Sequence, residues 1–405
     1  MSHIYERLIR RQRLIGVSLL GFGLLLLMLN LVQAMEGPLL PDPRSHSFAI
    51  DFRDYWIAAG RMNHGNSPYA SEMLLGPLSS QGLDRYRYPP VFAFLLIPLS
   101  NLPYQLAGLI FDAISLIALL AGLALSLRAV NRLSMKAMIW MAVGVVWFPP
   151  TIDFLLKGNV EGLQVLLIGL ILWAGAEVRG TAAIAAQAWL KIAPILILPA
   201  ALARGGRRSL VGLLVGSAIL VVPAFLVAPA GWWELPRILI NISVGNGSES
   251  VVNLAPASWF STLSIWATVA RIITLTATVG LVGMSIWIAR RPSGWPAAVA
   301  CGVIASLLFP SVIWFHYLVI LLPFIVMAWS QLRSNEQRLL TALLVALVAA
   351  MNLLPATGYN TQILVFTFLG MALAMGVCLR TLWPRHDVTF MAKRQSPAMS
   401  ALSEK

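Results

Sequence analysis

Charged residues and cysteines are both scarce in this sequence. Only 11% of its 405 residues are charged, whereas 59% are hydrophobic, and soluble domains carry about 25% charged residues. Cysteine occurs only at Cys301 and Cys378, both within apolar runs, which excludes a disulfide framework and a cysteine metal cluster. With a mean hydropathy of +0.79, the composition indicates an integral membrane protein.

Motifs for nucleic acid and for metal are absent as well. The net charge is +13, but no basic helix or aromatic-basic module accompanies it, so we expect no nucleic-acid partner. The chain has no close Asp-x-Asp pair and no His-Glu-x-x-His motif, and we therefore expect neither a metal site nor a cofactor. No internal repeat of fixed period appears, which excludes solenoid architectures.

Long apolar runs dominate what is present. A bilayer core about 30 Å thick needs roughly twenty apolar residues per helix, so the runs predict an all-α polytopic protein with about twelve spans. The expected spans are 13–35, 104–128, 137–149, 159–176, 180–190, 192–203, 208–228, 264–289, 296–310, 313–329, 339–355 and 361–381.

Basic residues cluster on every second connection between these runs. Cytoplasmic loops carry the excess of Lys and Arg, and this rule places 20 of the 29 basic residues inside. We therefore expect a multi-pass protein of the cell membrane with both termini cytoplasmic. The scheme requires Pro89 to Leu102 to lie along the outer surface, and 180–203 to form a hairpin of two short helices that turns at Lys191.

This topology gives one transmembrane domain, 1–383, followed by a mobile cytoplasmic tail, 384–405. Two connections on the outer side are long, 36–103 and 230–263. The first contains the amphipathic stretch 51–60, which predicts a short helix within the loop.

Ionisable residues within the expected spans gather toward the outer side. They are Asp112, Glu161, Lys191, Arg271 and His316. Because a charge in lipid is costly, such groups usually mark a polar cavity or a site. A cavity that opens outward is expected, and the oily inner halves of the spans argue against a transport path through the membrane centre.

Several short motifs are spread over roughly 1–385. They are Asp51-Phe-Arg-Asp-Tyr-Trp-Ile-Ala-Ala-Gly60, Gly65-Asn-Ser-Pro-Tyr69, Tyr88-Pro-Pro-Val-Phe92 with Pro98, Gly158-Asn159, Leu190-Lys191 with Pro194, Asn253, and Trp314-Phe-His-Tyr317 with Pro323. Together they resemble the motifs of glycosyltransferase family 87, including its mycobacterial phosphatidylinositol-mannoside mannosyltransferases. The resemblance implies a GT-C-like fold with two long outer loops, and a membrane enzyme that takes a sugar from a polyprenyl phosphate.

Such a reaction needs a base for the acceptor hydroxyl and cations for the departing phosphate. Asp51 matches the catalytic aspartate of the family, although on sequence alone Asp51 and Asp54 could equally begin the short helix. We favour Asp51 as the base, with Asp54 as the backup. Asp153 is interpreted as a turn residue, and Asp112 as an internal partner for a buried cation.

The family match makes His316 a second catalytic residue, in contact with phosphate or acceptor. Lys191 either binds the donor phosphate or pairs with Asp112 or Glu161, and the sequence leaves both open. Further phosphate-binding candidates are Arg87, Lys157 and Arg271. Asn159 and Asn253 are secondary candidates from the family motifs.

The sequence thus predicts an inverting glycosyltransferase at the outer face. It would move mannose or arabinofuranose from a polyprenyl-phosphate donor to an envelope glycolipid or glycan acceptor. A flippase or transporter for lipid-linked sugars is the main alternative, and it would require polar residues through the membrane centre. A non-catalytic anchor of an envelope complex would leave the outward ionisable residues without a purpose.

Overall fold

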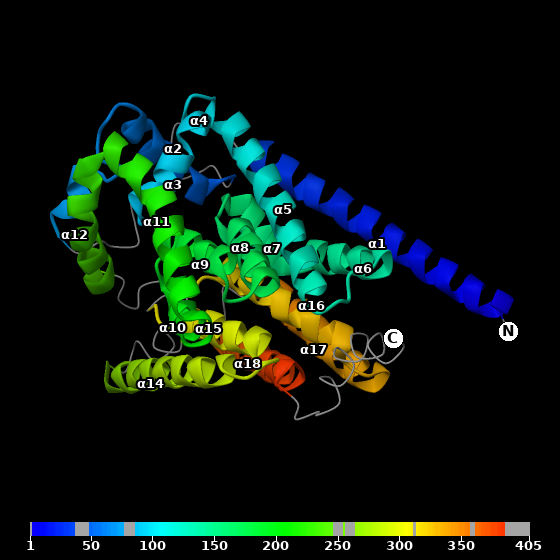
Figure 1. The fold of residues 1–405 in the computed structure, drawn as a ribbon. Helices are drawn as coiled ribbons and strands as arrows, with labels where there is room; N and C mark the ends of the chain where they lie inside the picture. Colours follow the sequence, from blue (N-terminus) through cyan, green and yellow to red (C-terminus); the bar gives the residue numbers. More distant parts are fainter. Residues whose placement is uncertain are drawn as a thin grey trace, which may run out of the picture.

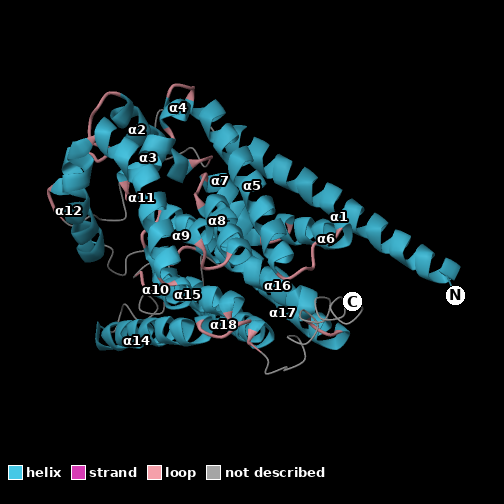
Figure 2. Cartoon of the chain, in the orientation of Figure 1, coloured by secondary structure: helices cyan, strands magenta, loops and turns pink. Residues whose placement is uncertain are grey.

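A computed structural model describes residues 2–36, 48–76, 86–245, 254–255, 264–310, 313–356 and 361–384. Within these ranges the chain forms helices joined by loops and contains no strand (Figure 2). The predicted all-helical class is thereby confirmed for the described part. Asn253 and the tail from residue 385 lie outside the described residues.

The helices follow one another along the chain as Figure 1 shows. The first half contains α1 (Ser2–Glu36), α2 (Ile50–Asn63), η1 (Ser71–Leu74), α3 (Pro90–Leu95), α4 (Ile97–Ser100), α5 (Tyr104–Ala129), α6 (Met135–Val146), α7 (Pro149–Lys157), α8 (Glu161–Ala174) and α9 (Val178–Leu190). The second contains η2 (Ala193–Ile197), α10 (Leu198–Gly205), α11 (Arg207–Val227), α12 (Pro229–Gly245), α14 (Ser264–Ala289), α15 (Trp295–Leu308), η3 (Phe315–Leu321), α16 (Leu322–Gln331), α17 (Ser334–Ala356) and α18 (Thr361–Leu382).

The prediction of about twelve spans is confirmed only in part. Five described helices are long and apolar enough to cross a membrane: Leu14–Val32 of α1, α5, α11, Thr268–Ala289 of α14 and Val365–Leu382 of α18. A sixth arises if α6 and α7, bent by 66°, form one broken span. Shorter apolar helices of 10–17 residues are Glu161–Ala174, Ala193–Gly205, Trp295–Leu308 and Phe315–Gln331.

Prolines account for much of this difference. Pro149, Pro194 and Pro323 each stand in the first turn of a helix, a position that suits their fixed φ and missing N–H. Runs that are continuous in hydropathy are therefore divided into short helices. Helix α8, which follows Gly158 at the end of α7, is also short. It has 14 residues and a length of about 21 Å, so it depends on surrounding protein to reach across a bilayer.

The parallel pair α5 and α8 lies at the centre of the bundle and comes unusually close. A Cβ on Gly162 would lie 2.1 Å from Ser115 O, and one on Gly169 would lie 2.2 Å from Gly122 O. Small residues of this kind let two helix backbones approach in a membrane. Since Ser115 faces Gly162 and Gly122 faces Gly169, both helices begin at the same end of the molecule.

The other ends of these helices join a cluster of basic connections. The Arg128 guanidinium lies 5.6 Å from the centre of the Trp173 ring. Arg204 donates to Ala289 O at 2.8 Å and to Arg291 O at 2.7 Å, which closes the last turn of α14. We call this group of connections, 128–132, 175–179, 204–208 and 289–292, the basic end.

The segment 180–203 folds back on itself, as the charge pattern predicts. Lys191 stands between α9 and η2. Ser209 Oγ lies 2.8 Å from both Ala176 O and Ala201 O, so the start of α9 and the end of α10 meet at the basic end. Lys191 therefore occupies the tip of the hairpin, away from the basic end.

The arrangement predicts that Ser71 in η1 and Ser334 at the start of α17 are accessible from opposite sides of the membrane. Both side chains are exposed, and the two native cysteines are buried and will not compete for label. In intact spheroplasts, a membrane-impermeant maleimide should modify Ser71→Cys at once and Ser334→Cys only after permeabilisation. Labelling of both positions from one side would contradict the topology.

Candidate active site

Helix α2 is fixed to the rest of the bundle through its first residues. Ala49 N donates to Leu156 O at 2.6 Å, next to the end of α7. The Tyr104 hydroxyl, at the start of α5, lies 3.0 Å from Phe48 O and 2.6 Å from Ala49 O. These contacts hold the first turn of α2, and with it Asp51, over the junction between α7 and α8.

Gly158 makes this close approach possible. It ends α7 with φ +66°, in the left-handed region that favours glycine. A Cβ at this position would lie 2.7 Å from Phe52 Cβ and 3.2 Å from Ala49 Cβ. The turn at Gly158 presents Asn159 to α2.

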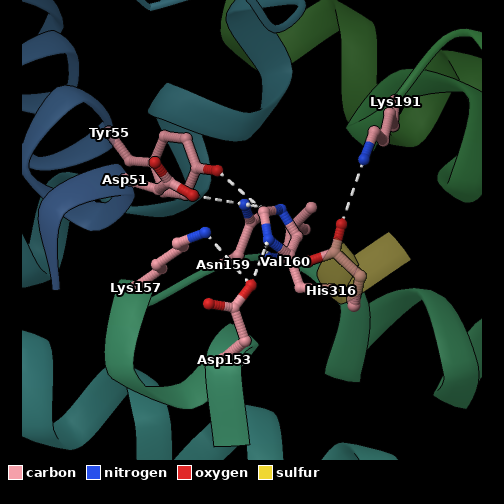
Figure 3. Close-up of polar contacts among 9 residues, drawn as sticks. Asp51, Tyr55, Asp153, Lys157, Asn159, Val160, Lys191 and His316 are labelled. Atoms are coloured by element: carbon pink, nitrogen blue, oxygen red, sulfur yellow. Dashed lines mark hydrogen bonds and ion pairs between the residues drawn. The ribbon is translucent and has the colours of Figure 1, made fainter. Parts of the chain in front are cut away.

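Asn159 is the centre of a hydrogen-bond network (Figure 3). Its Nδ2 lies 2.6 Å from Asp51 Oδ2 and 2.9 Å from His316 Nε2. Its Oδ1 accepts from Val160 N at 2.7 Å and from the Tyr55 hydroxyl at 3.1 Å. Asn159 itself is 3% exposed, so a buried amide joins α2, α8 and η3.

The network continues from His316 to α7. His316 Nδ1 lies 3.0 Å from Asp153 Oδ2, and Lys157 Nζ lies 3.1 Å from the same oxygen. The imidazole is buried, whereas Asp153 and Lys157 are partly exposed. Asp51 and Asp153 are thus connected through one histidine and one amide.

Lys191 lies beside this network and is paired. Its Nζ lies 3.0 Å from Glu161 Oε1 and 3.2 Å from the centre of the Tyr317 ring. The Glu161 side chain is fully buried. The sequence left open whether Lys191 binds the donor phosphate or pairs with a carboxylate, and in this structure it pairs with Glu161.

Aromatic side chains pack around the α2 side of the site. The Tyr55 ring centre lies 5.0 Å from that of Tyr88 and 4.8 Å from that of Phe92. Burial raises the pKa of Tyr55 well above its usual range, and the nearby Tyr88 and Asp51 add to this effect. The Tyr55 hydroxyl therefore keeps its proton and can donate to Asn159.

The structure gathers only some of the residues chosen from the sequence. Asp51, Asn159, His316 and Lys157 belong to one network, and Lys191 is adjacent to it. Half-buried Arg87 directly precedes Tyr88, and half-buried Asp54 lies in the turn of α2 that follows Asp51.

Two other candidates lie outside the network. Asp112 is buried in α5, and its carboxylate oxygens have no hydrogen-bond partner within the described ranges. The pairing of Asp112 with Lys191 or another cation is therefore absent from the described contacts. Arg271 is on α14, which lies far from α2 in Figure 1, and no described contact joins its side chain to the network.

Asp153 and Tyr55 were not among the expected site residues. The turn assigned to Asp153 is instead helix α7, which begins at the Pro149-Pro150 pair. Proline at the first helical positions, and the spacing of four residues between Asp153 and Lys157, are the signals that could have revealed this helix. Among the described residues, no three metal-binding side chains come together.

Comparison with protein families gives one match. The model of glycosyltransferase family 87 matches residues 86–311, which is more than half of the chain. The matched segment contains Asp153, Lys157, Asn159 and Lys191, while Asp51 precedes it and His316 follows it. A comparison with curated proteins found no match.

The close contact at Gly158 predicts a specific loss of stability. Gly158→Ala should lower the free energy of unfolding by about 1–3 kcal/mol, because the new methyl group must displace Phe52 and the start of α2. Gly65→Ala is the matched control, since Gly65 also has positive φ but its Cβ would meet nothing within 4 Å. Thermal unfolding in detergent measures both variants. Equal losses of stability in Gly158→Ala and Gly65→Ala would contradict the close contact between Gly158 and Phe52.

Proposed function

The chain belongs to glycosyltransferase family 87, and on this premise we propose that it transfers a sugar from a polyprenyl-phosphate donor. The proposed sugar is mannose or arabinofuranose, and the acceptor is an envelope glycolipid or glycan. Transfer takes place at the non-cytoplasmic face of the cell membrane with inversion at the anomeric carbon.

The observation that carries this proposal is the contact of Asn159 with both Asp51 and His316. These residues are 108 and 157 positions from Asn159 in the chain, yet one amide bonds to both. Asp51 and His316 are the two residues for which the family motifs imply catalytic roles. A general base must be held within hydrogen-bond reach of the proton that it takes, and the buried polar groups around Asp51 can hold its carboxylate in this way.

In the proposed reaction Asp51 takes the proton of the acceptor hydroxyl. The Asn159 amide holds Asp51 Oδ2 in place, and we assign Oδ1 to the incoming hydroxyl. The acceptor oxygen then forms a bond to the anomeric carbon as the bond from that carbon to the phosphate oxygen breaks. One displacement of this kind inverts the configuration, and the electron pair leaves with the polyprenyl phosphate.

Cations are needed where the leaving phosphate gains charge. We assign this role to Lys191, Arg87 and Lys157, with Arg271 as a further candidate. Lys191 pairs with Glu161, and Lys157 pairs with Asp153. In this proposal the leaving phosphate accepts one of the three hydrogens of each ammonium group.

The basic end suits the cytoplasmic side of the membrane in this proposal. Excess Lys and Arg mark cytoplasmic connections, and the network around Asn159 lies at the other end of α5 and α8. This orientation places Asp51 where a lipid-linked donor and an envelope acceptor meet outside the cytoplasm.

Asp51→Asn should lower the turnover of sugar transfer by at least about 100-fold, because the amide keeps the shape and loses the base. The test uses purified protein in nanodiscs with a panel of polyprenyl-phosphate sugars and candidate acceptors. Glu72→Gln is the control, an equivalent change at an exposed carboxylate of η1, and should leave turnover unchanged.

Full turnover by Asp51→Asn would contradict the proposed base, and Asp54→Asn then tests the backup. If the wild-type protein moves lipid-linked sugars across vesicles without transferring them, and Asp51→Asn does the same, the chain is a flippase and the enzymatic proposal fails.

Transfer should also continue in EDTA. The proposed cations at the phosphate are side chains, so a divalent ion has no assigned step. Rates measured with and without chelator should agree within about two-fold, whereas a metal-supported phosphate would lose several kcal/mol of stabilisation. Loss of activity in EDTA that magnesium or manganese restores would contradict this prediction.

A further inference from the structure

The orientation of the Asn159 amide follows from its neighbours. Val160 N can only donate, and it lies 2.7 Å from Oδ1 of Asn159. The protonated Tyr55 hydroxyl points to the same oxygen. With Oδ1 fixed in this way, the amide nitrogen must face Asp51 and His316 (Figure 3).

This orientation determines where the proton of His316 lies. The Nδ2 group has two hydrogens, and its two partners are Asp51 Oδ2 and His316 Nε2. Because Nδ2 donates to Nε2, Nε2 must offer its lone pair, and the ring proton must be on Nδ1. Nδ1 lies 3.0 Å from Asp153 Oδ2, which accepts that proton in a hydrogen bond.

We propose that Asp153 is a positioning residue for sugar transfer, because it holds His316 in the tautomer that keeps the Asn159 amide on Asp51. The hydrogen bonds then run in one direction, from Lys157 and His316 to Asp153, and from Asn159 to His316 and Asp51. This inference deepens the proposed function and rests on it for the role in transfer.

The opposite tautomer would break the arrangement. A proton on Nε2 would face the hydrogens of the Asn159 amide at a separation of 2.9 Å between the nitrogens. Asn159 would have to rotate, and rotation would remove its oxygen from Val160 N and its nitrogen from Asp51. Asp51 would lose the contact that fixes its carboxylate against the acceptor. For histidines that bind a metal, loss of the partner that fixes the tautomer commonly lowers affinity or activity about 10- to 100-fold, and we expect an effect of the same order here.

Asp153→Asn tests this inference with two measurements. The amide of the variant can donate to His316 Nδ1, which favours the tautomer with the proton on Nε2. The turnover of sugar transfer should fall about 10- to 100-fold, while KM for the acceptor changes less than about two-fold because no acceptor contact is assigned to Asp153. KM for the donor does not serve as a criterion, since Asp153 also pairs with Lys157, to which the donor phosphate is assigned. Glu177→Gln is the matched control, since Glu177 forms an exposed ion pair with Arg208 at the basic end, and its turnover should equal that of the wild type.

The second measurement does not depend on activity. Nitrogen-15 NMR of histidine-labelled protein, recorded with His316 neutral, distinguishes the two tautomers, and His316→Gln identifies the signal among the five histidines. The wild type should carry the proton on Nδ1, and Asp153→Asn should move it to Nε2.

The two measurements separate the possible failures. A wild-type proton on Nε2, or an unchanged tautomer in Asp153→Asn, would overturn the inference even if that variant is less stable. Unchanged turnover in Asp153→Asn would overturn the role in transfer. If no donor supports transfer by the wild type, the proposed function fails, and so does the role of Asp153 in transfer. The tautomer measurement still decides whether the hydrogen bonds around His316 are arranged as inferred.

Discussion

The buried amide of Asn159 is the contact on which the site depends, because it must satisfy four polar groups at once. Its oxygen accepts from Val160 N and Tyr55, and its nitrogen donates to Asp51 and His316. A buried polar group without a partner costs about 1–3 kcal/mol, so each of these groups restricts where the others can lie. Through this one side chain, α2 and η3 meet at the start of α8.

The packing around the amide is what keeps its partners in range. Gly162 brings α8 against α5, and α5 in turn holds the start of α2 through the Tyr104 hydroxyl. Gly158 leaves room for Phe52 beside Asn159. Glycines in a membrane bundle are commonly explained by helix association alone, but here they also determine the distance between Asp51 and the residue that orients it.

Part of this site could be predicted from the sequence, and the missing part has a physical reason. Asp51, Asn159 and His316 could be selected because each belongs to a short local motif that resembles one of the family. Asp153 could not, since its role arises only when α7 meets η3, and the Pro149-Pro150 pair was taken for a turn. The number of spans is confirmed only in part for a related reason, because several expected spans are helices of 10–17 residues, and hydropathy does not record where proline divides a run. The hairpin tip at Lys191 could be predicted because the alternation of basic connections is visible in the sequence itself, whereas the packing of helices is not.

The charges around Asn159 bear on how a phosphate donor would be accommodated. Three carboxylates, Asp51, Asp153 and Glu161, accompany two ammonium groups, Lys157 and Lys191, and His316 is neutral in the tautomer inferred above. In the proposed reaction the leaving phosphate gains one negative charge, while Asp51 loses one as it takes the acceptor proton. The total charge of the site therefore stays constant during transfer. A base that becomes neutral repels the departing phosphate less than a carboxylate that kept its negative charge would. This coupling explains why one carboxylate and a few cations are sufficient for the chemistry proposed here.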